Sequence, residues 1–122
     1  MRYVYNSSER KLRDLLYYNK ADGKPTHRPV CLNRKEGKLL MILSDRKFHT
    51  YEDISEFVWG TEIVTCKNIG EKYRIIDRKT ATNRISTTCH TMLNKIKPFE
   101  VQIKCKRDVG ITLISKEKIW IE

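Results

Sequence analysis

The fold is decided by two adjacent segments, Asn33-Arg-Lys-Glu-Gly-Lys-Leu-Leu-Met-Ile-Leu-Ser44 and Thr50-Tyr-Glu-Asp-Ile-Ser-Glu-Phe-Val-Trp-Gly60. Each begins with a residue that favours the N-cap of a helix and continues with apolar residues at helical spacing. In the first segment, Asn33 and Glu36 have the spacing of a capping box. In the second, Gly60 is placed to end a helix. We expect helices over Arg34–Ser44 and Tyr51–Trp59. We expect Ile54, Phe57 and Val58 to be the inward side chains of the second.

A third helix is predicted over Thr80–Lys97, and its polar face has no carboxylate. Thr80 or Thr82 can cap its start, and Pro98 follows its end. Its apolar stripe consists of Ile85, Cys89, Met92, Leu93 and Ile96. The opposite face carries Arg84, Thr87, Thr88, Thr91, Asn94 and Lys95. Such groups suit the phosphates and base edges of DNA, although a solvated helix of a basic protein would carry the same residues.

Strand-forming segments flank the three helices. Arg2–Tyr5 and Arg28–Leu32 favour strands, whereas Ser7–Tyr18 fits either a helix or a strand over Leu12–Tyr18. The composition of Asn19–Pro25 is that of a turn. The sequence therefore predicts a small antiparallel sheet over residues 1–32.

The C-terminal part has the pattern of a β-hairpin. Phe99–Cys105 alternates in period two, Lys106–Gly110 is a turn, and Ile111–Ile114 returns. Ile119–Ile121 can add a last strand. We expect one α+β domain over residues 1–122, with a sheet (1–32), a three-helix core (33–97) and a wing with a last strand (98–122). The core includes an apolar insert at 61–79, read as a hairpin or a packed loop.

The charge balance points to a polyanionic partner. The chain has 122 residues and a net charge of +10, which opposes compaction and is typical of proteins that bind nucleic acid or, second, an anionic membrane surface. No apolar run approaches the roughly 18 residues of a membrane span. The N-terminal residues lack the apolar region of a signal peptide, so we expect a cytoplasmic protein.

The sequence predicts neither a metal site, nor a cofactor, nor catalysis. Its four cysteines form no CxxC pair, and we expect them to be reduced and mostly buried. His27, His49 and His90 fall in three different elements, and no glycine-rich phosphate loop is present. We therefore expect a binding protein.

Several motifs resemble the winged helix-turn-helix domain of OmpR/PhoB-type regulators. That domain reads as a strand ending in Leu-Thr, a Glu, a Leu-Leu pair and a short helix ending Val-Trp-Gly. Here Leu32-Asn33, Glu36, Leu39-Leu40 and Val58-Trp59-Gly60 stand in these places. Val109-Gly110-Ile-Thr-Leu113 is similar to the wing strand. No receiver domain precedes the motif, so the layout is closest to the ToxR/CadC-like branch, without its membrane anchor, in a bacterium or phage. The connection before the third helix is longer than in the family, and Met92-Leu-Asn-Lys95 replaces the usual Leu-Arg-Lys-Lys.

The resemblance implies a sequence-specific transcriptional regulator that binds double-stranded DNA. The helix over 80–97 would enter the major groove, and the wing over 104–110 would lie on the minor groove or the backbone. The implied DNA-binding residues are Arg84, Thr87, Thr88, Thr91, Lys95, Lys97, Lys104, Lys106 and Arg107. If about six cations meet phosphates, affinity should fall roughly forty-fold per doubling of salt. A second copy of the chain on DNA and RNA polymerase are the further partners that the resemblance implies.

Other interpretations of these residues remain open at the level of sequence. Arg84 can pair with Asp77 instead, and Lys106 and Arg107 can be ordinary turn residues. We expect His90 to be a partly buried packing residue. The side chains assigned to the core are Trp59, Phe57 and Leu40. The alternative function is a winged-helix protein-interaction module that docks through the insert, because fold does not fix function. RNA binding is disfavoured, since no strand shows paired exposed aromatics.

Overall fold

The computed structural model describes residues 2–15, 29–60, 62–64, 75–107 and 109–122. In chain order the elements are β1 (Tyr3–Asn6), β2 (Lys11–Asp14), β3 (Val30–Cys31), α1 (Arg34–Leu43), α2 (Tyr51–Trp59), β4 (Glu62–Val64), β5 (Ile75–Asp77), α3 (Arg78–Lys95), the short 3-10 helix η1 (Lys97–Phe99), β6 (Gln102–Lys106), β7 (Gly110–Ile114) and β8 (Ile119–Ile121). All three predicted helices are present. Within the described residues, none of them is long and apolar enough to cross a membrane.

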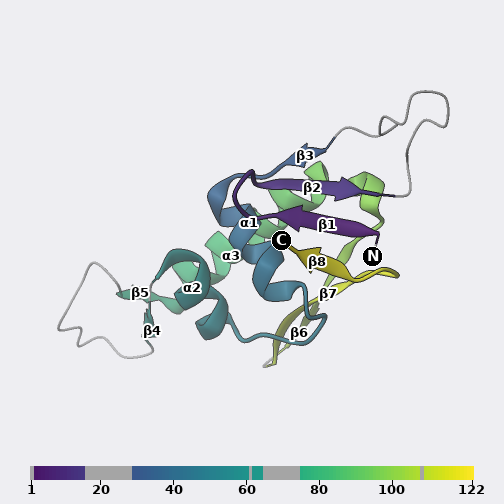
Figure 1. Ribbon diagram of the computed structural model, residues 1–122. Coiled ribbons are helices and arrows are strands. Elements are labelled where there is room, and N and C mark those ends of the chain that lie inside the picture. Colours follow the sequence, from purple (N-terminus) through teal and green to yellow (C-terminus); the bar gives the residue numbers. More distant parts are fainter. Residues whose placement is uncertain (1, 16–28, 61, 65–74, 108) are drawn as a thin grey trace, which may run out of the picture.

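The architecture is an α+β winged helix, as predicted. Figure 1 shows a sheet on one side of the three helices and the β6–β7 hairpin, the wing, extending from them. The sheet has the strand order β3-β2-β1-β8, and β8 runs parallel to β1. The strands within residues 1–32 pair antiparallel, as predicted, and the parallel strand is β8, which the sequence had offered as a last strand. The sheet is mixed because the C-terminal strand crosses the molecule to pair with the N-terminal one.

The ambiguous segment after β1 is a turn followed by a strand. In β2, Leu12 and Asp14 are buried, whereas Lys11 and Arg13 are half-buried, which is the period-two pattern of a sheet with one covered face. Tyr5 and Leu12 belong to one buried cluster with Leu39 of α1. The sheet therefore packs directly on the helices. The predicted turn at 19–25 lies outside the described residues.

The capping signals of α1 and α2 are confirmed. The Asn33 side chain accepts from the Glu36 N–H at 2.8 Å, and Glu36 accepts from the Asn33 N–H at 2.9 Å. The Thr50 hydroxyl accepts from the Asp53 N–H at 3.1 Å. Gly60 ends α2 in the left-handed conformation, with φ of 67°. These local bonds satisfy backbone groups that would otherwise lack partners at the helix ends.

Phe57 does not face the core, contrary to the prediction. Its side chain is 44% exposed, whereas Ile54, Ser55 and Val58 are buried. Each residue of a helix is rotated by about 100° from the one before it. The buried residues Ile54, Ser55 and Val58 therefore define a face whose centre lies roughly a third of a turn from Phe57. The buried face of α2 therefore includes the small Ser55 and leaves the larger aromatic outside.

The insert between α2 and α3 is framed by two short strands. β4 and β5 pair in parallel register, with Glu62 opposite Ile75 and Val64 opposite Asp77. A two-stranded parallel pair excludes the hairpin interpretation, because a hairpin requires antiparallel strands. Residues 65–74 lie outside the described part of the chain.

The base of the wing is joined to the loop between α1 and α2. The His49 N–H donates to the Ile111 carbonyl at 2.9 Å, and the Ile111 N–H donates to the His49 carbonyl at 3.0 Å. Gly110, with φ of 141°, brings its backbone so close that a Cβ there would collide with the His49 carbonyl. At Gly60, by contrast, a Cβ would meet no atom within 4 Å.

These two glycines make a matched pair of variants. Gly60→Ala should lower the free energy of unfolding by about 1 kcal/mol, the cost of a left-handed alanine. Gly110→Ala should cost at least about 3 kcal/mol, because backbone strain and a main-chain collision add together. Urea denaturation of both variants measures the difference. Equal losses would show that the wing does not depend on its close approach to His49.

Candidate nucleic-acid interface

α3 presents a continuous polar face to the solvent. It begins directly after β5, so Thr80 and Thr82 lie inside the helix and do not cap it, contrary to the prediction. The buried side consists of Ala81, Ile85, Cys89 and Met92, with Ile96 just after the helix. The exposed residues are Lys79, Thr80, Asn83, Ser86, Thr87, His90, Thr91, Asn94 and Lys95. None of these exposed residues is a carboxylate.

One flank of α3 borders a groove shared with α1 and α2. The groove has a volume of about 550 Å³, and its lining includes Lys35 of α1, Trp59 of α2 and, from α3, Arg84, Thr87 and Thr88. Arg84 and Thr88 are half-buried in it, whereas Thr87 is exposed. Within the described residues, Arg84 makes no hydrogen bond or ion pair, so its guanidinium is available to a ligand. Its alternative pairing with Asp77 involves a side chain outside the described part.

The other flank of α3 faces the wing. A smaller pocket of about 260 Å³ lies between them and is lined by Ser86, Cys89, His90 and Leu93 of α3, Ile103 and Cys105 of β6, and Tyr51, Ile85 and Ile111. His90 lines the rim of this pocket and is exposed. The expectation that it is a partly buried packing residue is therefore wrong. The Tyr51 hydroxyl and the Cys105 thiol share a hydrogen bond of 3.1 Å, which joins α2 to β6.

The predicted cations of the wing are all exposed. Lys104 and Lys106 stand in register with Thr112 and Gly110 of β7, so both point to the same face of the hairpin. Arg107 follows in the turn and is exposed, as is Lys97 in η1. The structure thus places Lys104, Lys106 and Arg107 together at the end of the wing.

Lys95 differs from the other predicted cations because it has a partner inside the protein. Its Nζ donates to Oε1 of Glu36 at 2.6 Å, and the Glu36 side chain has no exposed surface. Burial by itself would raise the pKa of Glu36, but the hydrogen bonds from Lys95 and from the Asn33 backbone hold that pKa below its usual value. A phosphate would have to compete with this carboxylate for Lys95.

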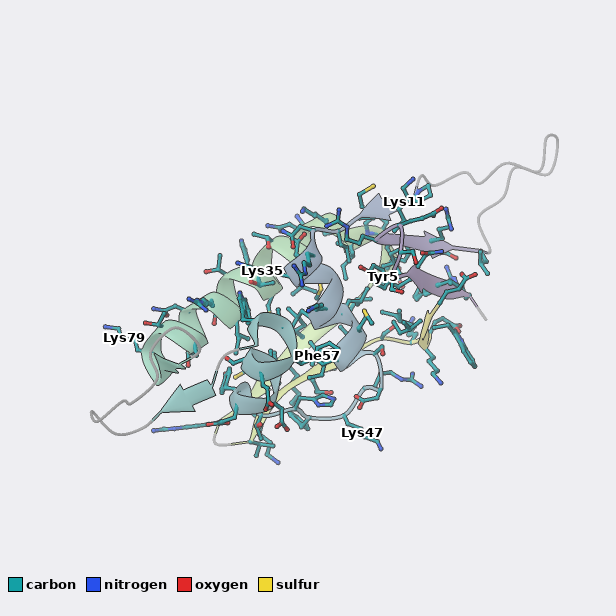
Figure 2. All side chains as sticks on the ribbon, turned by 60° about the vertical axis from the view of Figure 1, so that its left-hand side comes forward. Tyr5, Lys11, Lys35, Lys47, Phe57 and Lys79 are labelled. Atoms are coloured by element: carbon teal, nitrogen blue, oxygen red, sulfur yellow. The ribbon has the colours of Figure 1, made fainter. Side chains whose placement is uncertain are left out.

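Several exposed residues of this surface are not among the predicted DNA-binding residues. Asn83, Ser86, His90 and Asn94 are exposed on α3, and Lys79 lies in its first turn. Figure 2 shows Lys79 at the start of α3 and Lys35 beside the middle of the helix, with Lys47 on the far side of the molecule. A helical wheel centred on Ile85, Cys89 and Met92 would have identified Asn83 and His90, since both lie opposite this stripe.

The described cysteines are free thiols, but only one is buried. Cys89 is buried, whereas Cys31 and Cys105 are exposed, so the expectation of mostly buried cysteines is wrong for two of these three. Burial, with a smaller effect of the nearby Cys105 thiol, raises the pKa of Cys89 to about 12. That thiol stays protonated at neutral pH. Among the described residues, no three His, Cys, Asp or Glu side chains are grouped so that they could hold a metal ion.

The arrangement is therefore a polar helix with basic groups on both flanks. The wing supplies Lys104, Lys106 and Arg107 on one side, and Lys35 stands on the other. Such a surface offers hydrogen-bond donors and positive charge to a ligand.

No protein-family model matches the chain, and no curated protein matches it either.

The Glu36–Lys95 pair gives a prediction about stability. Lys95→Met should lower the free energy of unfolding at pH 7 by about 1–3 kcal/mol, because it leaves a buried carboxylate without its charged donor. The lowered pKa of Glu36 means that this contribution is present above the ordinary glutamate pKa of about 4.3 and is lost as the pH falls through the lower pKa of the folded state. The loss of stability between pH 7 and acid should therefore be smaller in Lys95→Met than in the wild type.

Urea denaturation across this pH range measures both effects. Lys97→Met is the matched control, because Lys97 is exposed and has no ion pair with another described residue. If the two variants were equally stable and had the same pH dependence, the ion pair would contribute nothing to the fold.

Proposed function

We propose that this protein binds double-stranded DNA through α3 and the wing and regulates transcription. The observation that carries the proposal is the exposed face of α3, where nine exposed residues from Lys79 to Lys95 include no carboxylate. A helix that faces only water usually carries both signs of charge. In a helix that lies against phosphates and the acceptor-rich edges of bases, carboxylates are disfavoured, because the phosphates repel them.

The width of α3 also suits the proposed partner. An α-helix with its side chains fills the major groove of B-DNA, which is about 12 Å wide. In that position the exposed Asn83, Thr87 and His90 would face base edges, and Thr91 would lie next to them. Arg84, on the flank, would reach either a guanine or a phosphate.

The wing extends the same surface. Lys104 and Lys106 would contact the phosphates, and Arg107 is placed in the turn from which it could enter a narrow minor groove. Lys97, in η1, is a further phosphate contact. We also propose that the chain is a distant relative of the OmpR/PhoB-type regulators that acts in the cytoplasm of a bacterium or a phage-infected cell. A second copy would bind beside it on DNA.

A protein-interaction module is the second candidate function. The observation that favours it is the β4–β5 pair, which holds the two ends of the 61–79 insert together next to α2 and α3 (Figure 1). An insert held in this way is suited to dock on a partner such as RNA polymerase. The two functions are separable, because only DNA binding requires the exposed face of α3.

The salt dependence of DNA binding tests the electrostatic part of the proposal. Five predicted cations other than Lys95 are exposed or half-buried: Arg84, Lys97, Lys104, Lys106 and Arg107. If each meets a phosphate, affinity for a random duplex should fall at least about twenty-fold for each doubling of salt. Fluorescence anisotropy of a labelled duplex at several salt concentrations measures this slope. A flat response would reject the proposed mode of binding.

Truncation of the α3 flank tests where the DNA lies. Arg84→Ala/Thr88→Ala should weaken duplex binding about tenfold or more, since one charged donor and one hydroxyl are lost at the proposed contact. Lys47→Ala removes one charge on the far side of the molecule and is the control (Figure 2). If both variants bound DNA equally well, the duplex would not lie on α3. Absence of any binding by the wild type at low salt would favour the protein-interaction module.

A further inference from the structure

We propose that the first two turns of α1 form a second phosphate-binding surface, on the side of α3 opposite the wing. Its residues are Arg34, Lys35 and Lys38, and its ligand is the phosphodiester backbone of the duplex whose major groove α3 occupies. The inference rests on the proposed function and extends it, because α1 lies outside the helix and wing assigned to DNA above.

The first observation is that α1 carries basic residues at its N-terminal end, where the helix dipole disfavours them. The N-terminal end of a helix carries a partial positive charge, so acidic residues stabilise it and basic residues do not. Arg34 and Lys35 occupy the first turn, Lys38 follows one turn later, and the one acidic residue of the first turn is Glu36. Glu36 is fully buried and is paired with Lys95, so it leaves the charges of Arg34 and Lys35 uncompensated at the surface.

These three cations also lack side-chain partners among the described residues. Arg34 and Lys35 are exposed, Lys38 is half-buried, and none of them forms a hydrogen bond or an ion pair with a side chain in the described part of the chain. Basic residues at a helix N-terminus oppose the helix dipole, and here no contact within the described fold offsets that cost. Such a mismatch indicates that the residues bind something outside the fold. The three residues therefore mark a site for an anionic ligand.

The second observation is that the surface formed by Arg34, Lys35 and Lys38 is continuous with the polar face of α3. A groove of about 350 Å³ is lined by Arg34, Lys35, Lys38 and Trp59, together with the C-terminal half of α2 from Glu56 to Gly60. Lys35 and Trp59 also line the groove of about 550 Å³ that contains Arg84, Thr87 and Thr88. Among the described residues that line these two grooves, Glu56 is the one carboxylate, against four cations. A single basic path thus runs from α1 to the polar face of α3.

The geometry of the major groove explains why both flanks of α3 are basic. A helix in this groove has one phosphodiester strand on each side, so two separate rows of phosphates border it. The wing stands on the flank that carries Ser86 and His90, with Ile103 and Cys105 toward α3, Lys104 and Lys106 on the other face of the hairpin and Arg107 in its turn. Lys35 stands on the flank that carries Arg84 and Thr88. One row of phosphates would therefore meet the exposed cations of the wing and the other would meet those of α1, and a contact on both strands would fix the angle of α3 in the groove.

The test is the change in salt dependence when charge is removed from α1. In Lys35→Gln/Lys38→Gln, the slope of log affinity against log salt should fall by about 1.8, since each lost phosphate contact contributes about 0.9. Lys47→Gln/Lys116→Gln removes the same net charge from the α1–α2 loop and the β7–β8 connection, and its slope should stay close to that of the wild type. Lys35→Arg/Lys38→Arg keeps the charge and should keep the slope. Urea denaturation of each variant verifies that it is folded.

The outcomes separate this inference from the proposed function. If the wild type binds duplex DNA with a steep slope and Lys35→Gln/Lys38→Gln keeps that slope, α1 does not touch the backbone and the inference fails alone. Equal losses in the α1 variant and in the control would also overturn it, because net charge would then explain the effect. If the wild type does not bind DNA but binds poly-glutamate through Lys35 and Lys38, the ligand is an acidic protein segment, and both proposals fail.

Discussion

The carboxylate of Glu36 connects the two helices on which the candidate interface is built. It closes the capping box at the start of α1 and accepts from Lys95 in the last turn of α3, at 2.6 Å. Moving a carboxylate out of water is costly, and only charged or backbone donors close at hand offset that cost. The folded arrangement in which Oε1 of Glu36 has both of its donors is therefore one in which the N-terminus of α1 lies against the C-terminal half of α3. This contact sets the groove in which Lys35, Trp59 and Arg84 meet.

The wing is positioned by a different kind of contact. The paired hydrogen bonds between His49 and Ile111 attach β7 to the loop before α2, and they need Gly110 because no side chain fits against the His49 carbonyl. Ile111 and Leu113 then enter the same buried cluster as Leu43 and Ile54. The hairpin is thus fixed at its base by backbone and core contacts, while its turn, with Lys106 and Arg107, extends into the solvent. This combination keeps a charged tip at a defined distance from α3.

The proposed interface makes physical sense of a charge distribution that the fold alone does not need. The net charge of +10 works against compaction, and cations at the start of α1 work against the helix dipole. Within the described residues, the one cation of the interface that stabilises the fold through an ion pair is Lys95. The others are exposed or half-buried on the two flanks of α3. A polyanion with two parallel rows of charge, such as a DNA groove, is the ligand that such a distribution matches.

The sequence by itself determined the features that depend on neighbours in the chain. Asn33 with Glu36, Thr50 and Gly60 predicted the ends of α1 and α2, because caps are formed within a few residues of backbone. The three helices, the wing and the absence of carboxylates from α3 could likewise be read from periodicity and composition. Only the tertiary structure decided what depends on partners far along the chain. It placed β8 beside β1, paired β4 with β5 in parallel, turned Phe57 outward, exposed His90 and engaged Lys95 with Glu36. The local sequence pattern specifies which face of a helix is apolar. How all the elements pack together decides which element covers that face and which charged side chains form ion pairs.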